Sequence, residues 1–269
     1  MFIDTHCHIN TMIKKEFDVP LSSDFKPLAQ AILNEAAIQR VTQIINVGTS
    51  LTESLNCMHL AVAFPNVWAT LGTHPNDVSD TWKHDIAEYK KILNSENKSR
   101  IVGIGEIGLD YHYPDFNKQR QYDAFRCQIE LALEYDLAIV IHTRDAHDET
   151  LRVLEEYKRD QMRGIIHCFS ETMAFAEFAQ ELGFLLGIGG PLTYPKNQLL
   201  RDIFTAVPLT SIVLETDAPF LPPQYMRGKP NSPSQIAYIA GYLADLRKLP
   251  IEEVAQVTTA NAHRLFRIE

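Results

Sequence analysis

Short apolar runs rich in Val and Ile recur along the whole chain and alternate with longer segments of helical periodicity. The runs occupy residues 2–6, 43–48, 67–72, 101–106, 137–142, 164–168, 184–189 and 211–216. Near-continuous apolar runs are typical of parallel strands that are covered on both faces. The segments 119–136 and 171–183 place apolar residues at i, i+3 and i+4, which predicts amphipathic helices.

This alternation, repeated about eight times, predicts an α/β fold of the (β/α)8 TIM-barrel type. An open doubly wound sheet is the alternative, and it predicts a glycine-rich phosphate loop after the first strand. Residues 5–10 read THCHIN and contain no glycine, which favours the barrel. No linker rich in Gly, Ser or Pro and no internal repeat divides the chain, so we expect one domain over residues 1–269.

The composition limits the classes of function. Of the residues, 45% are hydrophobic and 22% are charged, with no apolar stretch long enough for a membrane span. The first residues do not have the pattern of a signal peptide, so we expect a cytoplasmic protein. A net charge of -9 argues against a protein that coats nucleic acid with a broad basic surface. An enzyme that binds a few phosphates locally remains compatible with it.

The active site of a TIM barrel lies at the carboxyl ends of the strands. In this chain polar side chains that are able to bind metals follow most of the predicted strands: His6 and His8, His74, Glu106 with Asp110, His142 with Arg144, His167 with Ser170, and Asp217. This frequency exceeds what a barrel needs for stability. Two histidines separated by one residue on a strand project to the same face, as is suitable for chelation.

The nitrogen and oxygen donors at these strand ends indicate a metal centre. One catalytic zinc usually takes about three protein ligands, and this set is larger. We therefore expect two divalent metal ions, Zn, Mg or Mn, bridged by the carboxylate of Glu106. The predicted ligands are His6, His8, Glu106, His142, His167 and Asp217.

Five ordered motifs carry a resemblance to a known family. They are THCH at 5–8, GEIGLDY at 105–111, IHTRDA at 141–146, IHCFS at 166–170 and LETDAPFL at 214–221. In this order they resemble the TatD family of metal-dependent deoxyribonucleases in the amidohydrolase superfamily. The resemblance implies a distorted (β/α)8 barrel of the metallo-dependent hydrolase type, with a two-metal site.

The resemblance also implies a role for each ligand. One metal would be held by His6, His8, Glu106 and Asp217, and the other by Glu106, His142 and His167. Asp217 would act as a catalytic residue with Glu106 and would take the proton from the attacking water.

Two loops depart from the family pattern. Where members usually show HPH after the third strand, this chain has His74-Pro75-Asn76, and where many show NEP it has Asn231-Ser232-Pro233. Neither departure replaces a predicted ligand. Both affect loops expected to line the substrate cleft, so they bear on substrate preference.

The residues near the predicted ligands suit a phosphate ester. Arg144 can bind a phosphate through two hydrogen bonds, and Ser170 and Arg227 can add donors. Tyr111 can stack on a nucleobase, while His74 and Asp110 are expected to contact substrate or support the site. The leading hypothesis is a DNA phosphodiesterase that acts on short single-stranded ends. The 3′ to 5′ direction is implied by the resemblance, and no obligate protein partner is evident.

Two alternatives remain open. The same site can hydrolyse another bond, such as a D-aminoacyl-tRNA ester, an amide or a lactone, and an apolar acyl pocket would then replace the phosphate donors at the cleft. A catalytically silent scaffold on the same fold would have lost a ligand, and no predicted ligand is missing.

Overall fold

A computed structural model describes all residues from Met1 to Glu269. Eight parallel strands form one sheet in the order β1-β2-β3-β4-β5-β6-β7-β8, and each strand pairs with the next one along the chain. The predicted barrel is therefore confirmed. The strands are β1 (Phe2–Cys7), β2 (Val41–Asn46), β3 (Val67–Leu71), β4 (Ile101–Asp110), β5 (Ala138–Arg144), β6 (Gly164–Ile166), β7 (Leu185–Ile188) and β8 (Ile212–Leu214).

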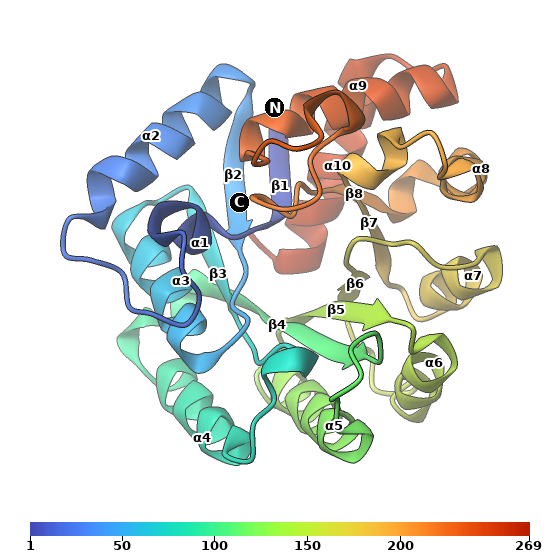
Figure 1. The fold of residues 1–269 in the computed structure, drawn as a ribbon. Coiled ribbons are helices and arrows are strands. Elements are labelled where there is room, and N and C mark those ends of the chain that lie inside the picture. The colour runs from blue at the N-terminus through green and yellow to red at the C-terminus, as the bar shows by residue number, and fades with distance from the viewer.

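Figure 1 shows the helices arranged around the strands. They are α1 (Ile9–Lys14), α2 (Phe25–Ile38), α3 (Leu51–Ala63), α4 (Trp82–Leu93), α5 (Lys118–Glu134), α6 (His147–Glu156), α7 (Met173–Glu181), α8 (Gln198–Ala206), α9 (Ile236–Arg247) and α10 (Ile251–Phe266). Side chains of Ser50, Asn117 and Thr172 accept backbone N–H groups at the starts of α3, α5 and α7. None of the helices has both the length and the apolar character that crossing a membrane requires.

Two apolar layers hold the barrel together. A large layer packs the helices against the outside of the strands. A smaller cluster fills the barrel interior with Ile3, Ile45 and other strand residues, and it includes Leu265 and Phe266 from the end of α10. Helix α10 therefore closes the amino-terminal end of the barrel, which leaves the carboxyl end for the site.

The barrel closes between β1 and β8 through side-chain and isolated backbone bonds instead of a regular ladder. The backbone N–H of Asp217 donates to His6 O at 2.9 Å. The buried Asp4 carboxylate accepts from Thr216 N at 3.0 Å and from Thr216 Oγ1 at 2.6 Å. These bonds join the segment that carries Asp217 to the strand that carries His6.

Strand β1 does not alternate as regularly as its sequence predicts. Ile3 packs inside the barrel, whereas Cys7 packs in the outer layer. The pairing of β1 with β2 shifts register between Asp4 and Cys7, and this irregularity breaks the two-residue period. The rings of His6 and His8 nevertheless meet, because His8 lies just after the strand.

Candidate metal centre

A cavity of about 650 Å³ opens at the carboxyl ends of the strands. It is the place where residues from all eight strands or the segments after them converge. Of the side chains predicted from the sequence, its lining includes His8, His74, Glu106, Asp110, His142, Arg144, His167, Ser170 and Asp217. The buried His6 lies directly behind this lining, with its Nε2 3.4 Å from Glu106 Oε2.

Four donor atoms surround one point at the bottom of this cavity. His6 Nε2 lies 3.2 Å from His8 Nε2 and 3.4 Å from Glu106 Oε2, and Asp217 Oδ1 lies 3.6 Å and 3.3 Å from the two imidazoles. Ligands bound tetrahedrally at 2.0–2.1 Å are separated by about 3.3–3.4 Å. His6, His8 and Glu106 are therefore close enough together to share one divalent metal ion, and Asp217 lies beside the two histidines.

A hydrogen bond to the backbone determines which ring nitrogen of His8 carries the proton. His8 Nδ1 lies 3.0 Å from the carbonyl oxygen of Val47, and a carbonyl only accepts hydrogen bonds. Nδ1 therefore carries the proton, and Nε2 presents a lone pair toward Asp217 and His6. A backbone carbonyl that orients a metal-binding histidine in this way is a common device in metalloproteins.

Glu106 places its two carboxylate oxygens in different surroundings. Oε2 faces His6, whereas Oε1 lies 2.9 Å from His142 Nδ1 and 3.9 Å from His167 Nε2. A carboxylate that faces one donor set with each oxygen is suited to bridge two cations. The second set is wider than the first, so its ligands have to move inward to share one ion.

His167 is supported by a carboxylate that the sequence interpretation missed. Its Nδ1 lies 3.0 Å from Glu215 Oε1, while its Nε2 faces Asp217. Glu215 is buried and also accepts the backbone N–H of Cys168 at 2.5 Å. Gly187 on β7 makes room for this carboxylate, because a Cβ there would clash with it. The position of Glu215 in LETDAPFL, two residues before Asp217, was the available signal.

Asp110 connects the loop that contains Asn76, which differs from the family pattern, to the proposed ligand His142. It accepts from Asn76 Nδ2 at 2.9 Å and lies 3.2 Å from His142 Nε2. His142 is therefore held between Asp110 on one side and Glu106 on the other. Asn76 stands in the loop where the resemblance leads one to expect a histidine, and it here serves as a donor to Asp110.

The carboxylates dominate the electrostatics of the site. Burial lowers the pKa of His167, but Glu215 and Glu106 outweigh it and raise that pKa to about 10. Burial likewise opposes protonation of His142, and bonds to Asp110 and Glu106 raise its pKa to about 9. The pKa of Glu106 lies well below its usual value, because the surrounding imidazoles outweigh its burial. The site therefore attracts positive charge, which protons or metal ions can supply.

His74 differs from His8 in which nitrogen is free. Its Nδ1 accepts the backbone N–H of Asn76 at 3.2 Å, so in the neutral ring the proton lies on Nε2. Burial lowers the pKa of His74 to about 3, which keeps the ring neutral. Its Nε2 is 3.7 Å from Glu106 Oε1. His74 therefore presents a donor to the cavity, as a substrate contact requires.

Two residues predicted to bind substrate lie outside this lining. The ring of Tyr111 stacks on Phe116 with centroids 4.7 Å apart, and Lys118 lies over it at 4.3 Å. The guanidinium of Arg227 lies over the Tyr194 ring at 4.8 Å. Both are engaged with neighbouring loop residues, so their contact with substrate stays a prediction.

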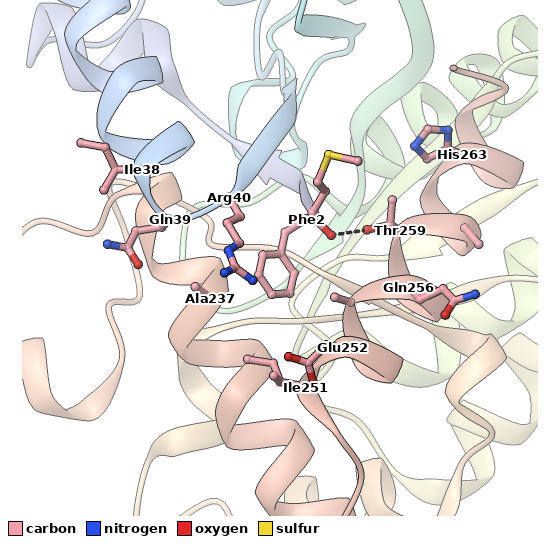
Figure 2. Close-up of a pocket in the computed structure, with 13 residues that line it drawn as sticks. Phe2, Ile38, Gln39, Arg40, Ala237, Ile251, Glu252, Gln256, Thr259 and His263 are labelled. Atoms are coloured by element: carbon pink, nitrogen blue, oxygen red, sulfur yellow. Dashed lines mark hydrogen bonds between the residues drawn. The ribbon is translucent and has the colours of Figure 1, made fainter.

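A second cavity of about 770 Å³ lies among α2, α9, α10 and the start of β1, where Figure 2 shows Phe2, Ile38, Ala237 and Ile251 around it. None of the predicted site residues lines it. Its mostly apolar lining offers no set of metal ligands.

Comparisons with known proteins also indicate a metal-dependent enzyme. A model of the family of TatD related DNases matches residues 3–267. The chain is 35% identical over 268 residues to a protein of Bacillus subtilis (strain 168) named uncharacterized metal-dependent hydrolase YabD, covering 100% of both chains. It is 32% identical over 253 residues to the 3'-5' ssDNA/RNA exonuclease TatD of Pectobacterium parmentieri (strain WPP163), covering 92% of this chain and 96% of that protein.

Among solved structures, the TatD homolog YJJV from Escherichia coli K12 superimposes with a TM-score of 0.88 at 33% identity. The match covers 100% of this chain and 98% of that one. An uncharacterized amidohydrolase from Saccharomyces cerevisiae has a TM-score of 0.78 at 15% identity over 98% and 99% of the two chains, a likeness of fold alone.

Proposed function

The chain belongs to the family of TatD-related DNases and is a metal-dependent hydrolase, and from this premise we propose that it removes nucleotides from the 3′ end of single-stranded DNA with two divalent metal ions. The observation that carries the proposal is the position of Glu106, whose two carboxylate oxygens face separate sets of histidines. The name of the Pectobacterium relative supports the direction and the single-stranded substrate, and it adds RNA as a substrate to test.

The proposed ligands form two sets that share Glu106. His6, His8 and Asp217 belong to the first set, and His142 and His167 to the second. When bound, the two cations act as Lewis acids toward the phosphoryl oxygens and acidify the attacking water. The other steps fall to the chain's own residues.

Arg144 and His74 bind the phosphate in this proposal. Arg144 lines the cavity, and its guanidinium suits two phosphate oxygens at once. The Nε2–H of His74 donates one further hydrogen bond. Ser170, which also lines the cavity, adds a hydroxyl.

Asp217 takes the proton from the attacking water. Its burial opposes ionisation, but the neighbouring imidazoles of His8, His167 and His6 outweigh it and lower its pKa. Asp217 is therefore a carboxylate at neutral pH. Its backbone has φ 57, a left-handed conformation that aspartate tolerates better than most residues.

The test follows nucleotide release from short DNA and RNA strands labelled at either end. The wild type is compared with Glu106→Ala after chelation and after return of Mg, Mn or Zn. Release from the 3′ end that needs metal and is absent in Glu106→Ala supports the proposal. Glu134→Ala, which removes an exposed carboxylate paired with Lys90 on the outer surface, is the matched control.

A D-aminoacyl-tRNA ester is assayed in parallel. Hydrolysis of the ester together with no release from any strand would contradict the nuclease and favour the alternative chemistry on the same metals. The arginine and hydroxyl donors in the cavity favour the phosphodiester.

A further inference from the structure

Two large aromatic side chains are exposed at the edge of the metal cavity. Phe17 has 62% and Phe220 has 39% of its surface exposed, and both line that cavity. Phe17 follows α1, and Phe220 follows β8, so they come from opposite ends of the chain. Both phenylalanines present apolar surface to the water in a polar cavity, and a bound ligand can cover that surface.

The two rings lie nearly parallel, with an interplanar angle of 9° and centroids 6.1 Å apart. A planar group that stacks on one ring is therefore parallel to the other. The Phe220 ring also lies 5.9 Å from the ring of His8, edge to face. The aromatic pair thus directly adjoins the metal ligands.

Hydrogen bonds fix the backbone at Phe220 and next to Phe17. Phe220 N donates to Asp217 O at 2.7 Å, and Asn231 Nδ2 donates to Phe220 O at 2.8 Å. Next to Phe17, the N–H of Asp18 donates to Glu53 at 2.6 Å, and Lys14 binds the same carboxylate. The backbone that carries the pair is therefore fixed, which lowers the entropy lost when a ligand stacks on the rings.

The surface beyond Phe17 is acidic. A neighbouring cavity of about 570 Å³ shares Phe17, Thr49 and Asp77 with the metal cavity. Its lining also contains Asp18 and Asp85, together with Glu53, whose charge Lys14 offsets, and includes no lysine or arginine. Such a wall repels phosphate, whereas Arg144 in the metal cavity attracts it. A strand is therefore expected to end at the aromatic pair and to leave past Arg144.

We propose that Phe17 and Phe220 form a stacking platform for the base of the terminal nucleotide, and that the acidic wall behind it stops the strand there. The proposal rests on the nuclease function proposed above and adds how the enzyme selects an end. Stacking is available to every base, so the platform selects an unpaired end without selecting sequence.

The test compares strands whose terminal nucleotide has a normal base with strands whose terminal nucleotide is abasic. In the wild type the missing base should lower kcat/KM about 10-fold to 100-fold, mainly through KM. Phe17→Ala with Phe220→Ala should lower kcat/KM on normal ends by a similar factor and leave abasic ends unchanged. Phe17→Trp should keep the preference for normal over abasic ends, and Phe17→Leu should reduce it.

Tyr238→Ala is the matched control, because Tyr238 is 41% exposed and lies outside the metal cavity. Metal content and thermal unfolding of each variant exclude a folding defect. The single Phe17 variants keep the proposal falsifiable if Phe220→Ala disturbs the neighbouring Asp217. Equal cleavage of normal and abasic ends by the wild type would overturn the platform and leave the nuclease function standing.

A binding measurement tests the stacking platform independently of cleavage. A strand that ends in 2-aminopurine, with a phosphorothioate as its last linkage to slow hydrolysis, is titrated with metal-loaded protein. Quenching that requires Phe17, together with no cleavage of natural strands, would support the platform and contradict the nuclease. No quenching and no cleavage would overturn both.

Discussion

The two ends of this barrel hold cavities of similar size and opposite chemistry. The cavity at the carboxyl ends, about 650 Å³, is lined by four histidines and four carboxylates, whereas the cavity at the amino-terminal end, about 770 Å³, is mostly apolar. The difference teaches that the direction of the strands, and not the size of a cavity, locates the site. Side chains at the carboxyl ends are free to serve chemistry, while those at the other end pack against α10.

Left-handed backbone occurs at both ends of the barrel, since Arg40 beside the apolar cavity has a φ of 63°, but only at the carboxyl end does it lie next to metal ligands. Cys168 and Asp217, in the loops after β6 and β8, have left-handed φ values of 45 and 57. Such conformations cost about 1–2 kcal/mol for a residue with a side chain. Strained residues beside metal ligands indicate that the carboxyl end gives up stability for position. Function and stability should therefore respond separately to substitutions at the two ends.

The largest expected effect is on catalysis at the carboxyl end. Glu106→Gln keeps the shape of the side chain but removes the charge that both donor sets face. We expect kcat to fall about a thousandfold or more, because both cations lose their shared ligand. Steady-state kinetics and metal analysis of the purified variant check this. Activity within tenfold of the wild type at full metal content would contradict the shared role.

The next effect should appear at the other end and only in stability. Phe266→Ala removes a buried ring from the cluster that closes the barrel. We expect a loss of about 3–5 kcal/mol in the free energy of unfolding, from lost burial and the cavity left behind. Urea denaturation measures this loss. The kcat of the folded fraction should stay unchanged, and a parallel loss of kcat would show that the two ends are coupled.

Much of the difference between the two ends of the barrel could be predicted from the sequence. Strands covered on both faces must be apolar throughout, so the eight runs were visible, and the donors His6, Glu106 and Asp217 stood where those runs end. Long-range contacts could not be predicted. The bond from His8 to Val47, the room that Gly187 leaves for Glu215 and the closure by Phe266 each depend on residues distant in the chain.

Loop conformation set a further limit. Tyr111 and Arg227 are predicted from their place in the sequence to contact the substrate. The structure places them against Phe116 and Tyr194, outside the cavity lining, and their contact with substrate stays a prediction. Phe17 lies in no motif or periodic segment, and Phe220 lies in the LETDAPFL motif without a periodic pattern that predicts its direction.

A smaller effect on the carboxyl end is expected from Glu215→Gln. Glu215 contacts Nδ1 of His167, the nitrogen on the other side of the ring from the Nε2 that faces Asp217. Loss of such a partner typically lowers metal affinity about 10-fold to 100-fold. Metal titration of the chelated variant tests this, with Glu134→Gln as the control on the outer surface. An unchanged affinity would assign Glu215 to holding the Cys168 backbone alone.

Metal removal should make stability depend on pH. The pKa values of His142 and His167 are raised to about 9 and 10 in the metal-free chain. A raised pKa means that protonation stabilises the folded state fully below the unfolded value of about 6.5, and that this stabilisation is lost as the pH rises through the folded value. The chelated protein should therefore melt several degrees lower at pH 10 than at pH 6.5.

Bound metal should reduce this dependence, because the cations replace the protons on the imidazoles. Thermal unfolding from pH 6.5 to pH 10, with chelator and with metal, measures the difference. Parallel curves with and without metal would contradict the placement of His142 and His167 in the site.

The smallest effect is expected from Ile38→Ser at the rim of the apolar cavity. Ile38 is 78% exposed, so its replacement removes little buried surface. Stability should change by no more than about 0.5 kcal/mol, and kcat/KM should not change. Both quantities follow from the denaturation and kinetic assays above. A clear loss of activity here would break the comparison. It would mean that the larger cavity contributes to the reaction although its lining has no set of metal ligands and no phosphate donor aligned with the metal centre.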